Sequence, residues 1–299
     1  MNKTLKNWLL TPFNILYRIS PTLTLRILFR LKLKSKLNLL EPKTFSEKIN
    51  WLKLYYRNDL MVECVDKFAA RGYIERLGFE NHLAKLYWHG DDPEQIPFDT
   101  LPQAFVIKST SGSGNNIIVK DKAKLNRELV KKKFRKWLKE KYLVAYGEWC
   151  YGKVKPSIVV EEFLSDGENF VPIDYKFFCF NKMNGNEEPS VGCIGVDLDR
   201  FSGHKRLVMD SEWNYLPDTE LGFPTRSDVD VPKPVAFDEM CAVAVKLAKP
   251  FPTCRIDFYV IGDKFYIGEI TFFDNAGFAK IVPPEFNNLM GSWIALPKR

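Results

Sequence analysis

The chain has 299 residues, of which 45% are hydrophobic and 14% aromatic, and this composition excludes a disordered chain and allows one large or two ordinary domains. The net charge of +7 arises in residues 1–40, which contain eight Lys and Arg and no acid, whereas the rest of the chain sums to 36 − 37 = −1. Because the positive charge is confined to residues 1–40, the rest of the chain is not expected to bind nucleic acid. The six cysteines form no C-x-x-C pair and the three histidines have no metal-ligand spacing, so we expect reduced thiols, a cytoplasmic location and no zinc site.

The basic N-terminal segment mixes cations with apolar residues. Pro12 and Arg18 interrupt its apolar stretch, no small-residue cleavage site follows, and no run of about 18 apolar residues could span a membrane. Two interpretations remain: a helical hairpin packed on the body with a solvated basic face, or an amphipathic arm in the interface of an anionic membrane. Both make residues 1–43 a basic amphipathic arm.

The remaining chain alternates predicted helices and strands. Apolar spacing and capping residues predict helices over residues 44–56, 66–78, 125–141 and 237–251. Short apolar runs bounded by turns predict strands over residues 83–90, 104–109, 115–121, 156–164, 174–180, 190–200 and 254–273. This pattern predicts an α+β fold with antiparallel sheets in two lobes, residues 44–164 and 165–299, and a cleft between them.

A glycine-rich turn after Lys108 is the most distinctive local feature. In FVIKSTSGSGNNIIV, residues 105–119, a strand ends on the lysine and a loop of small residues leads into a returning strand. Small residues let backbone N–H groups approach phosphate oxygens, and the lysine adds positive charge. The order differs from the Walker pattern, in which lysine follows the glycines. An ordinary β-hairpin explains the window equally well.

A second hairpin is predicted in RIDFYVIGDKFYIGEITFFDNAGF, residues 255–278. Strand alternation puts Arg255 and Asp257 on one face, and Glu269 and Thr271 on one face of the returning strand. A turn at residues 262–263 reverses the chain, and a hairpin of this length can bring Asp257 opposite Glu269, which would give two oxygen ligands for Mg²⁺. The alternative is the solvent side of a plain hairpin.

The order of these segments resembles the ATP-grasp superfamily, and within it the branch named for teichuronopeptide biosynthesis. The resemblance runs from TFSEKINWLK at residue 44 and DKFAAR at residue 66 through FVIKSTSGSGNNIIV, IVVEEFL and DYKFFCF to RIDFY and GEITFFDNAG. It covers residues 44–296 and implies an ATP-grasp fold, with two α+β lobes enclosing ATP and Mg²⁺.

The resemblance assigns roles to matching positions. Lys67 and Lys108 correspond to lysines that contact nucleotide phosphates, and Arg255 to an arginine that stabilises the transition state. The other implied positions are the phosphate loop Ser111, Gly112, Ser113 and Gly114, the adenine and ribose hinge Glu161, Glu162 and Phe163, and the metal ligands Asp257 and Glu269, with Thr271 or Asn275 as a third ligand.

The implied activity is ATP- and Mg²⁺-dependent ligation of a carboxylate to an amine. A uronic-acid or amino-acid carboxylate is activated as an acyl phosphate, which the amine attacks. For this branch the resemblance implies a capsule, O-antigen or teichuronopeptide-like polysaccharide, with a saccharide substrate that can be lipid-linked and an amino acid as the amine. The basic arm then suits a peripheral position at the inner face of the cytoplasmic membrane. Asp174, Lys176 and Arg200 are candidate contacts to the acceptor, although surface salt bridges explain them equally well.

Three other functions remain open from the sequence. A glycosyltransferase would use the D-x-D of Asp197 and Asp199 to hold a metal-bound sugar nucleotide. A sugar kinase would use the same ATP site to phosphorylate a hydroxyl. A non-catalytic nucleotide-binding scaffold is disfavoured by the presence together of Lys108, Arg255 and the carboxylate pair.

Overall fold

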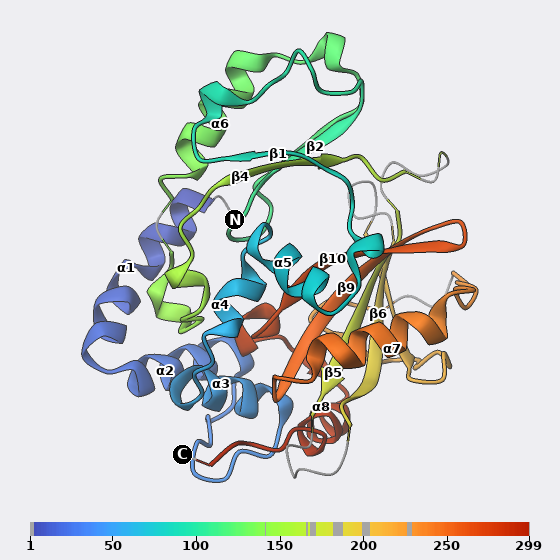
Figure 1. The fold of residues 1–299 in the computed structure, drawn as a ribbon. Coiled ribbons are helices and arrows are strands. Elements are labelled where there is room, and N and C mark those ends of the chain that lie inside the picture. The colour runs from blue at the N-terminus through green and yellow to red at the C-terminus, as the bar shows by residue number, and fades with distance from the viewer. Residues whose placement is uncertain are drawn as a thin grey trace.

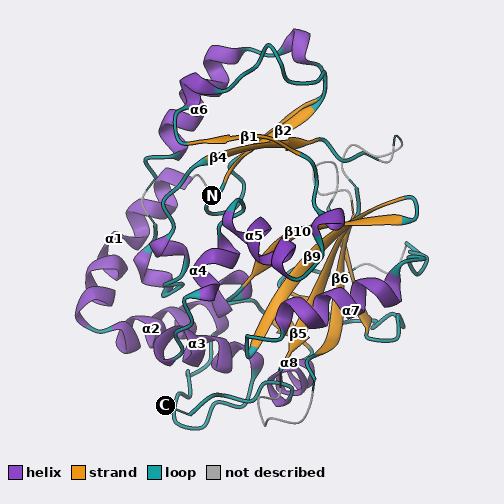
Figure 2. Ribbon diagram, viewed as in Figure 1, coloured by secondary structure: helices purple, strands orange, loops and turns teal. Residues whose placement is uncertain are grey.

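A computed structural model describes residues 3–140, 142–165, 167, 172–181, 188–198, 204–225 and 229–298. Two sheets dominate the architecture, a smaller one near the top of Figure 1 and a larger one below it. Helices pack around their edges and outer faces (Figure 2). No helix in the described part of the chain is long and apolar enough to cross a membrane.

The N-terminal arm folds as a helical hairpin on the protein body. Helices α1 (Lys3–Ile19) and α2 (Pro21–Leu33) are joined at Ser20, whose hydroxyl accepts a hydrogen bond from the Leu23 amide and caps α2. Leu25, Leu28 and Phe29 on α2 are buried in the main core. The hairpin of the first interpretation is therefore present as an integral part of the packed structure, and membrane contact through its exposed face stays a prediction.

Helix α3 (Phe45–Tyr55) begins where the sequence predicts. The Thr44 side chain accepts from the Glu47 amide and the Glu47 carboxylate accepts from the Thr44 amide, which forms a capping box. Helices α4 (Leu60–Val65) and α5 (Ala69–Arg76) follow, and Gly78 continues from α5 in a left-handed conformation. Helix α4 contacts strand β10 (Lys264–Thr271) of the larger sheet, and both helices contribute buried side chains to its core.

The smaller sheet has the strand order β1-β4-β2-β3 and all its pairs are antiparallel. Its core contains Phe105, Ile107, Val160 and Phe134, the last from the charged helix α6 on the sheet's outer side. The bounds are β1 Leu86–Gly90, β2 Phe105–Ser109, β3 Asn116–Val119, β4 Ile158–Glu162 and α6 Arg127–Trp137. Short 3₁₀ turns lie at η1 Glu80–His82, η2 Pro93–Gln95, η3 Lys122–Lys124, η4 Val144–Tyr146 and η5 Tyr151–Lys153.

The larger sheet has the antiparallel order β10-β9-β5-β6-β7. Its two faces differ, because β5 alternates Phe177, which packs against Phe237 of α7, with Lys176, which faces the smaller lobe. The bounds are β5 Asp174–Phe180, β6 Ser190–Leu198, β7 Lys205–Asp210, β9 Thr253–Ile261, β10 Lys264–Thr271 and α7 Phe237–Ala248. Strands β8 (Glu220–Leu221) and β11 (Ile281–Val282) pair with each other, η6 spans Asp274–Gly277 and α8 spans Pro284–Ser292.

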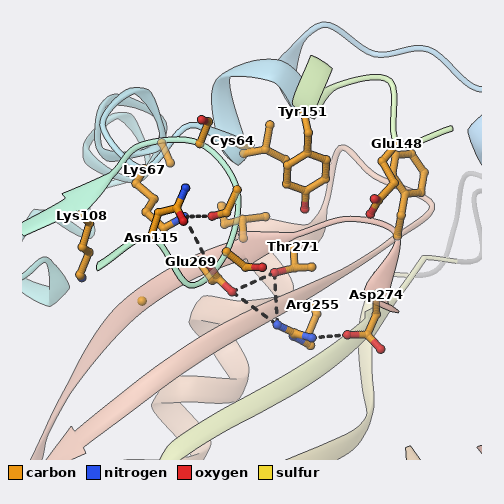
Figure 3. A pocket seen from close by; sticks show the side chains of 18 of the residues that line it. Cys64, Lys67, Lys108, Asn115, Glu148, Tyr151, Arg255, Glu269, Thr271 and Asp274 are labelled. Atoms are coloured by element: carbon orange, nitrogen blue, oxygen red, sulfur yellow. Dashed lines mark hydrogen bonds and ion pairs between the residues drawn. The ribbon is translucent and has the colours of Figure 1, made fainter. Parts of the chain in front are cut away.

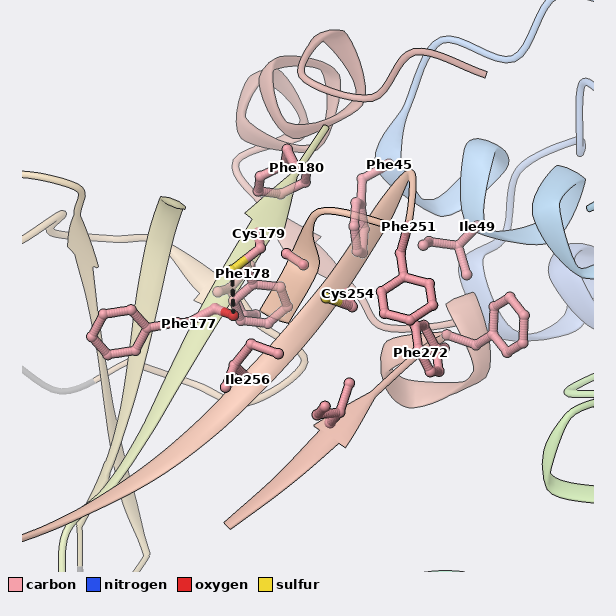
Figure 4. Close-up of a cluster of buried hydrophobic side chains, with 14 of the residues drawn as sticks. Phe45, Ile49, Phe177, Phe178, Cys179, Phe180, Phe251, Cys254, Ile256 and Phe272 are labelled. Atoms are coloured by element: carbon pink, nitrogen blue, oxygen red, sulfur yellow. Dashed lines mark hydrogen bonds between the residues drawn. The ribbon is translucent and has the colours of Figure 1, made fainter. Parts of the chain in front are cut away.

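Aromatic residues join α3 to the same face of β5 that carries Lys176. Phe45 packs edge-to-face against both Phe178 and Phe180 (Figure 4). The half of this face beyond Lys176 is thus covered by α3. On the other half of this face, Lys176 lines the space between the two sheets.

The predicted α+β class with antiparallel sheets is confirmed. The predicted lobe boundary at residue 165 falls between β4 and β5, and residues 45–74 share the core of the larger sheet. The sequence analysis did not anticipate β7 or α8, and it treated the region that contains β8 as a loop. The three-part division of the chain stays a prediction.

Candidate active site

A cavity of about 830 Å³ lies between the two sheets, a size that small-molecule sites commonly have. Both lobes line it: Lys67, Lys108 and Glu161 from the first, and Lys176, Arg255 and Glu269 from the second. Residues that the sequence analysis selected from five separate segments therefore meet in one place. Figure 3 shows part of this cavity with Lys67, Lys108, Arg255 and Glu269 labelled.

Lys108 is held by a carboxylate at the end of the neighbouring strand. Its Nζ lies 2.8 Å from Glu161 Oε2, and Arg71 donates to the other oxygen, Oε1, at 3.1 Å. Burial alone would raise the pKa of Glu161, but Lys108 and Arg71 outweigh burial and lower it. Glu161 is therefore a buried anion between two cations, Lys108 on β2 and Arg71 on α5, and both cations line the cavity.

The glycine-rich loop lies beside a second lysine. Lys67 Nζ donates to the Gly112 carbonyl at 2.8 Å, and the Lys67 amide donates to Thr110 O at 3.0 Å. Gly112 has φ +73°, which favours glycine at that position. The same ammonium lies 3.8 Å from Glu269 Oε2 on the opposite lobe. Lys67 thus joins the loop to the carboxylate hairpin across the cavity.

The predicted pairing of the carboxylate hairpin is confirmed. Asp257 on β9 is the register partner of Glu269 on β10, and Arg255 is the partner of Thr271. Arg255 binds both Asp257 oxygens, with Nε 2.6 Å from Oδ1 and NH2 2.8 Å from Oδ2, and lies 3.5 Å from Glu269 Oε1. Burial alone would lower the pKa of this guanidinium, but Asp257 and Asp274 raise it well above its usual value.

Asp274 is a site residue that the sequence analysis missed. It binds Arg255 directly, and its Oδ2 accepts a hydrogen bond from the Asn275 amide nitrogen at 2.9 Å. Both residues lie on a tight turn in which Phe273, Asn275 and Ala276 all have positive φ. Such backbone is costly for residues other than glycine and marks functional sites. The sequence signal that could have indicated this turn is DNAG, residues 274–277, which follows the predicted strand that carries Glu269.

Lys176 lies in a row of buried charges on the larger sheet. Its Nζ is 2.7 Å from Asp174 Oδ2, 2.8 Å from Asp257 Oδ2 and 3.8 Å from Asp197 Oδ2. Lys176 and Arg255 hold the pKa of Asp257 far below its usual range despite burial, which acts in the opposite direction. Asp174 and Lys176 are therefore buried members of the site network, so the surface salt-bridge alternative is wrong for them.

Asp197 does not have the environment that the glycosyltransferase alternative needs. Arg206 binds both of its oxygens, at 2.5 and 2.7 Å, and His204 Nε2 lies 3.0 Å from Oδ1. An aspartate already neutralised in this way is poorly placed to hold a metal-bound sugar nucleotide. Its predicted companion Asp199 lies outside the described residues, as does Arg200.

The carboxylates fit a magnesium ion that brings further ligands with its nucleotide. Glu269 has 37% of its side chain exposed to the cavity, whereas both Asp257 oxygens are bonded to Arg255 and Lys176. Among the described residues, no cluster of three or more His, Cys, Asp or Glu could hold a metal ion. Mg²⁺ commonly binds through one or two carboxylates and completes its shell with phosphate and water, which suits this donor set.

Several predicted residues lie at the edge of the cavity. Glu161 lines it but Glu162 and Phe163 do not, and Leu164 takes the next lining position of the hinge. In the loop, Ser111, Gly112 and Ser113 line the cavity and Gly114 does not. Lys32 of the arm reaches the cavity and lies 5.1 Å above the Tyr146 ring, a position that the sequence did not indicate.

Comparison with known proteins gives a family-level match. The sequence model of the family described as TupA-like ATPgrasp matches residues 47–295. No curated protein matches the chain.

Similar solved structures include the D-alanine–D-alanine ligase of Helicobacter pylori (14% identity, TM-score 0.44, 84% of this chain and 69% of that one) and the D-alanyl-alanine synthetase A of Vibrio cholerae (9%, 0.40, 76% and 57%). The N5-carboxyaminoimidazole synthetase of Staphylococcus aureus is also similar (11%, 0.42, 78% and 52%). The chain spans little more than half the length of the last two proteins.

Proposed function

Because the chain belongs to the TupA-like ATP-grasp family, we propose that it is an ATP- and Mg²⁺-dependent ligase that joins a carboxylate to an amine. The observation that supports this most directly is the convergence of Lys67, Lys108, Arg255 and Glu269 on one cavity between the sheets. Phosphoryl transfer needs position and charge more than a protein nucleophile, and these side chains supply both.

The two lobes have different roles, phosphate binding in the first and metal binding with transition-state stabilisation in the second. Lys67, Lys108 and the backbone of the 111–113 loop bind the nucleotide phosphates from the first lobe. Glu269, which lines the cavity, would hold Mg²⁺ with Asp257 as its register partner on β9, and the ion would neutralise charge on the transferred phosphoryl group. Arg255 faces the same point, held by Asp257 and Asp274 so that its guanidinium does not need to reorganise during the reaction. Thr271 and Asn275 remain candidates for the third metal contact.

For the biological substrate we propose a uronic-acid carboxylate of a cell-surface polysaccharide or its lipid-linked precursor, with an amino acid as the amine. The arm suits a membrane-associated precursor. Its end presents exposed apolar and basic side chains together, with Ile19 76% and Leu23 47% exposed. We call this surface the arm patch: Arg18, Ile19, Leu23, Arg26 and Arg30. It would place the enzyme at the cytoplasmic face of an anionic membrane.

Nucleotide selectivity and substrate dependence test this function. The purified protein is heated with Mg²⁺ and either ATP or UDP-sugars, and phosphate release is then measured with a panel of uronates and amino acids. We expect stabilisation by ATP and phosphate release only when a carboxylate and an amine are both present. Stabilisation by UDP-sugars alone would refute the ligase. Transfer of phosphate to a sugar hydroxyl in the absence of an amine would show that the protein is a kinase and not a ligase.

A further inference from the structure

The cavity continues beyond the phosphate-facing cations to an end that no nucleotide role explains. One wall is the segment from Tyr142 to Tyr151, and the other is the turn with Asp274 and Asn275. Figure 3 shows Glu148 and Tyr151 facing the side that carries Thr271, Arg255 and Asp274. Tyr151, Glu148, Glu269 and Arg255 all line this one cavity.

Helix α3 fixes both walls of this end. Lys53 is fully buried, and its ammonium donates to Tyr146 O at 2.9 Å and to Ala276 O at 2.7 Å, one carbonyl from each wall. Asn50 donates to the Gly277 carbonyl at 2.9 Å. A buried cation that bridges two carbonyls sets the spacing of the walls, so this end of the cavity is a built site.

The chemistry of the walls suits an ammonium group. Tyr142, Tyr146 and Tyr151 supply aromatic surface and Glu148 supplies a carboxylate, the combination that recognises an ammonium. One protein ammonium is already there, because Lys32 Nζ lies 5.1 Å from the centre of the Tyr146 ring. The buried Tyr142 hydroxyl makes no hydrogen bond to a side chain among the described residues, and a buried hydroxyl that lacks partners is unfavourable. A polar ligand at this end would satisfy it.

We propose that this end of the cavity is the amine subsite of the ligase and that Glu148 accepts the proton of the incoming ammonium. The inference rests on the proposed ligase function. The ammonium gives one proton to Glu148, and the resulting amine attacks the acyl carbon of the acyl phosphate. The C–N bond forms, the C–O bond to phosphate breaks, and the phosphate leaves with the electron pair and takes up the second amine proton. Arg255 lies across the cavity from Glu148 (Figure 3) and would face the departing phosphate.

Hydroxylamine separates this role from carboxylate activation. It is unprotonated near neutral pH and traps acyl phosphates as hydroxamates, so it needs no carboxylate to deprotonate it. We expect Glu148→Gln to form hydroxamate from the uronate panel within about two-fold of the wild type. Amide formation at pH 7 should fall by on the order of 100-fold or more, as for loss of a general base. The deficit should shrink as pH rises toward 9.5, because solution base then deprotonates the amine.

Two variants control for folding and for nonspecific charge loss. Glu148→Asp keeps a carboxylate and should recover part of the amide rate, and Glu128→Gln, on the exposed face of α6, should behave as the wild type. Equal loss of hydroxamate and amide in Glu148→Gln would overturn the proposal, because it would place the carboxylate in activation or folding. An unchanged amide rate would also overturn it.

If the wild type forms no hydroxamate with any uronate, the proposal of a uronate substrate is refuted. The amine subsite is then tested separately by measuring whether amino acids bind. Saturation-transfer NMR with Mg²⁺-ADP and a mixture of the standard amino acids then compares the wild type with Glu148→Gln. Binding that is lost in the variant supports the subsite. The absence of amine binding, or equal binding by both proteins, refutes it.

Discussion

Lys53→Met should change how stability depends on pH, because the lysine is wholly buried without a carboxylate at hydrogen-bond distance among its described contacts. Burial lowers the pKa of Lys53 from 10.5 to about 7, with Glu148 acting in the opposite direction. The unfolded chain therefore binds more protons than the folded chain between these two values. The unfolding free energy of the wild type rises with pH across that window.

The size of the effect follows from the two pKa values. Each pH unit within the window adds about 1.4 kcal/mol, so between pH 6 and pH 9 the wild type should gain about 3 kcal/mol relative to the methionine variant. At pH 6 the variant is relieved of a buried charge but leaves the carbonyls of Tyr146 and Ala276 without their donor. At pH 9 only the second effect remains, and the variant should be clearly the less stable protein.

Urea unfolding of both proteins at pH 6, 7.5 and 9 measures this difference. Lys132→Met, an exposed change on α6, is the control and should follow the wild type at every pH. Parallel stability curves for the wild type and Lys53→Met would refute the reasoning. They would mean that Lys53 is solvated or paired in the folded protein.

Three further predictions concern the metal site, the turn and the arm. Glu269→Gln should reduce Mg²⁺-dependent phosphate release by on the order of 100-fold or more, while Glu285→Gln on α8 should not; equal rates would exclude Glu269 as a metal ligand. Gly277→Ala should lower the unfolding free energy, measured in urea melts, by about 2–4 kcal/mol, because φ is +68° and the added Cβ would lie 2.7 Å from Ile49 Cγ2. The control is Gly262→Ala, which also has positive φ but has open space around it, and this change should cost only about 1 kcal/mol. Replacing the three arginines of the arm patch with Gln should abolish sedimentation with anionic liposomes, and the same change at three exposed lysines of α6 (Lys132, Lys133 and Lys136) should not; equal losses would leave only general charge attraction.

The faces of the carboxylate hairpin could be predicted from the sequence because strand alternation is a local rule. A two-residue turn that pairs Ile261 with Lys264 would put Asp257 opposite Gly268, and the bulge between Ile267 and Glu269 shifts the register so that Asp257 lies opposite Glu269. The capping box at Thr44 is equally local. The meeting of Lys67 and Lys108 with this hairpin across a cavity depends on how two lobes pack. Its prediction came from the family resemblance.

Other site residues escaped prediction because their roles depend on contacts distant in sequence. Lys53 looks like a surface lysine of an amphipathic helix, and only the approach of residues 146 and 276 buries it. The sequence around Arg71 predicts only that it lies in a helix, because its partner Glu161 is 90 residues away along the chain. Lys32 belongs to a segment whose composition suggests only a basic arm. Its place in the cavity follows from the packing of α2 in the main core.

The ion pairs of the cavity also indicate how a polyanionic nucleotide can bind without leaving a buried carboxylate unpaired. If Lys108 turns toward a phosphate, Glu161 keeps Arg71. If Arg255 shifts toward the transferred group, Asp257 keeps Lys176, and if Lys67 leaves Glu269, that carboxylate becomes available to the metal. Removing one partner of a buried pair is costly when nothing replaces it. Because each carboxylate has a second cation or a metal to take over, the phosphate-binding cations are stabilised before ATP binds and remain available when it does.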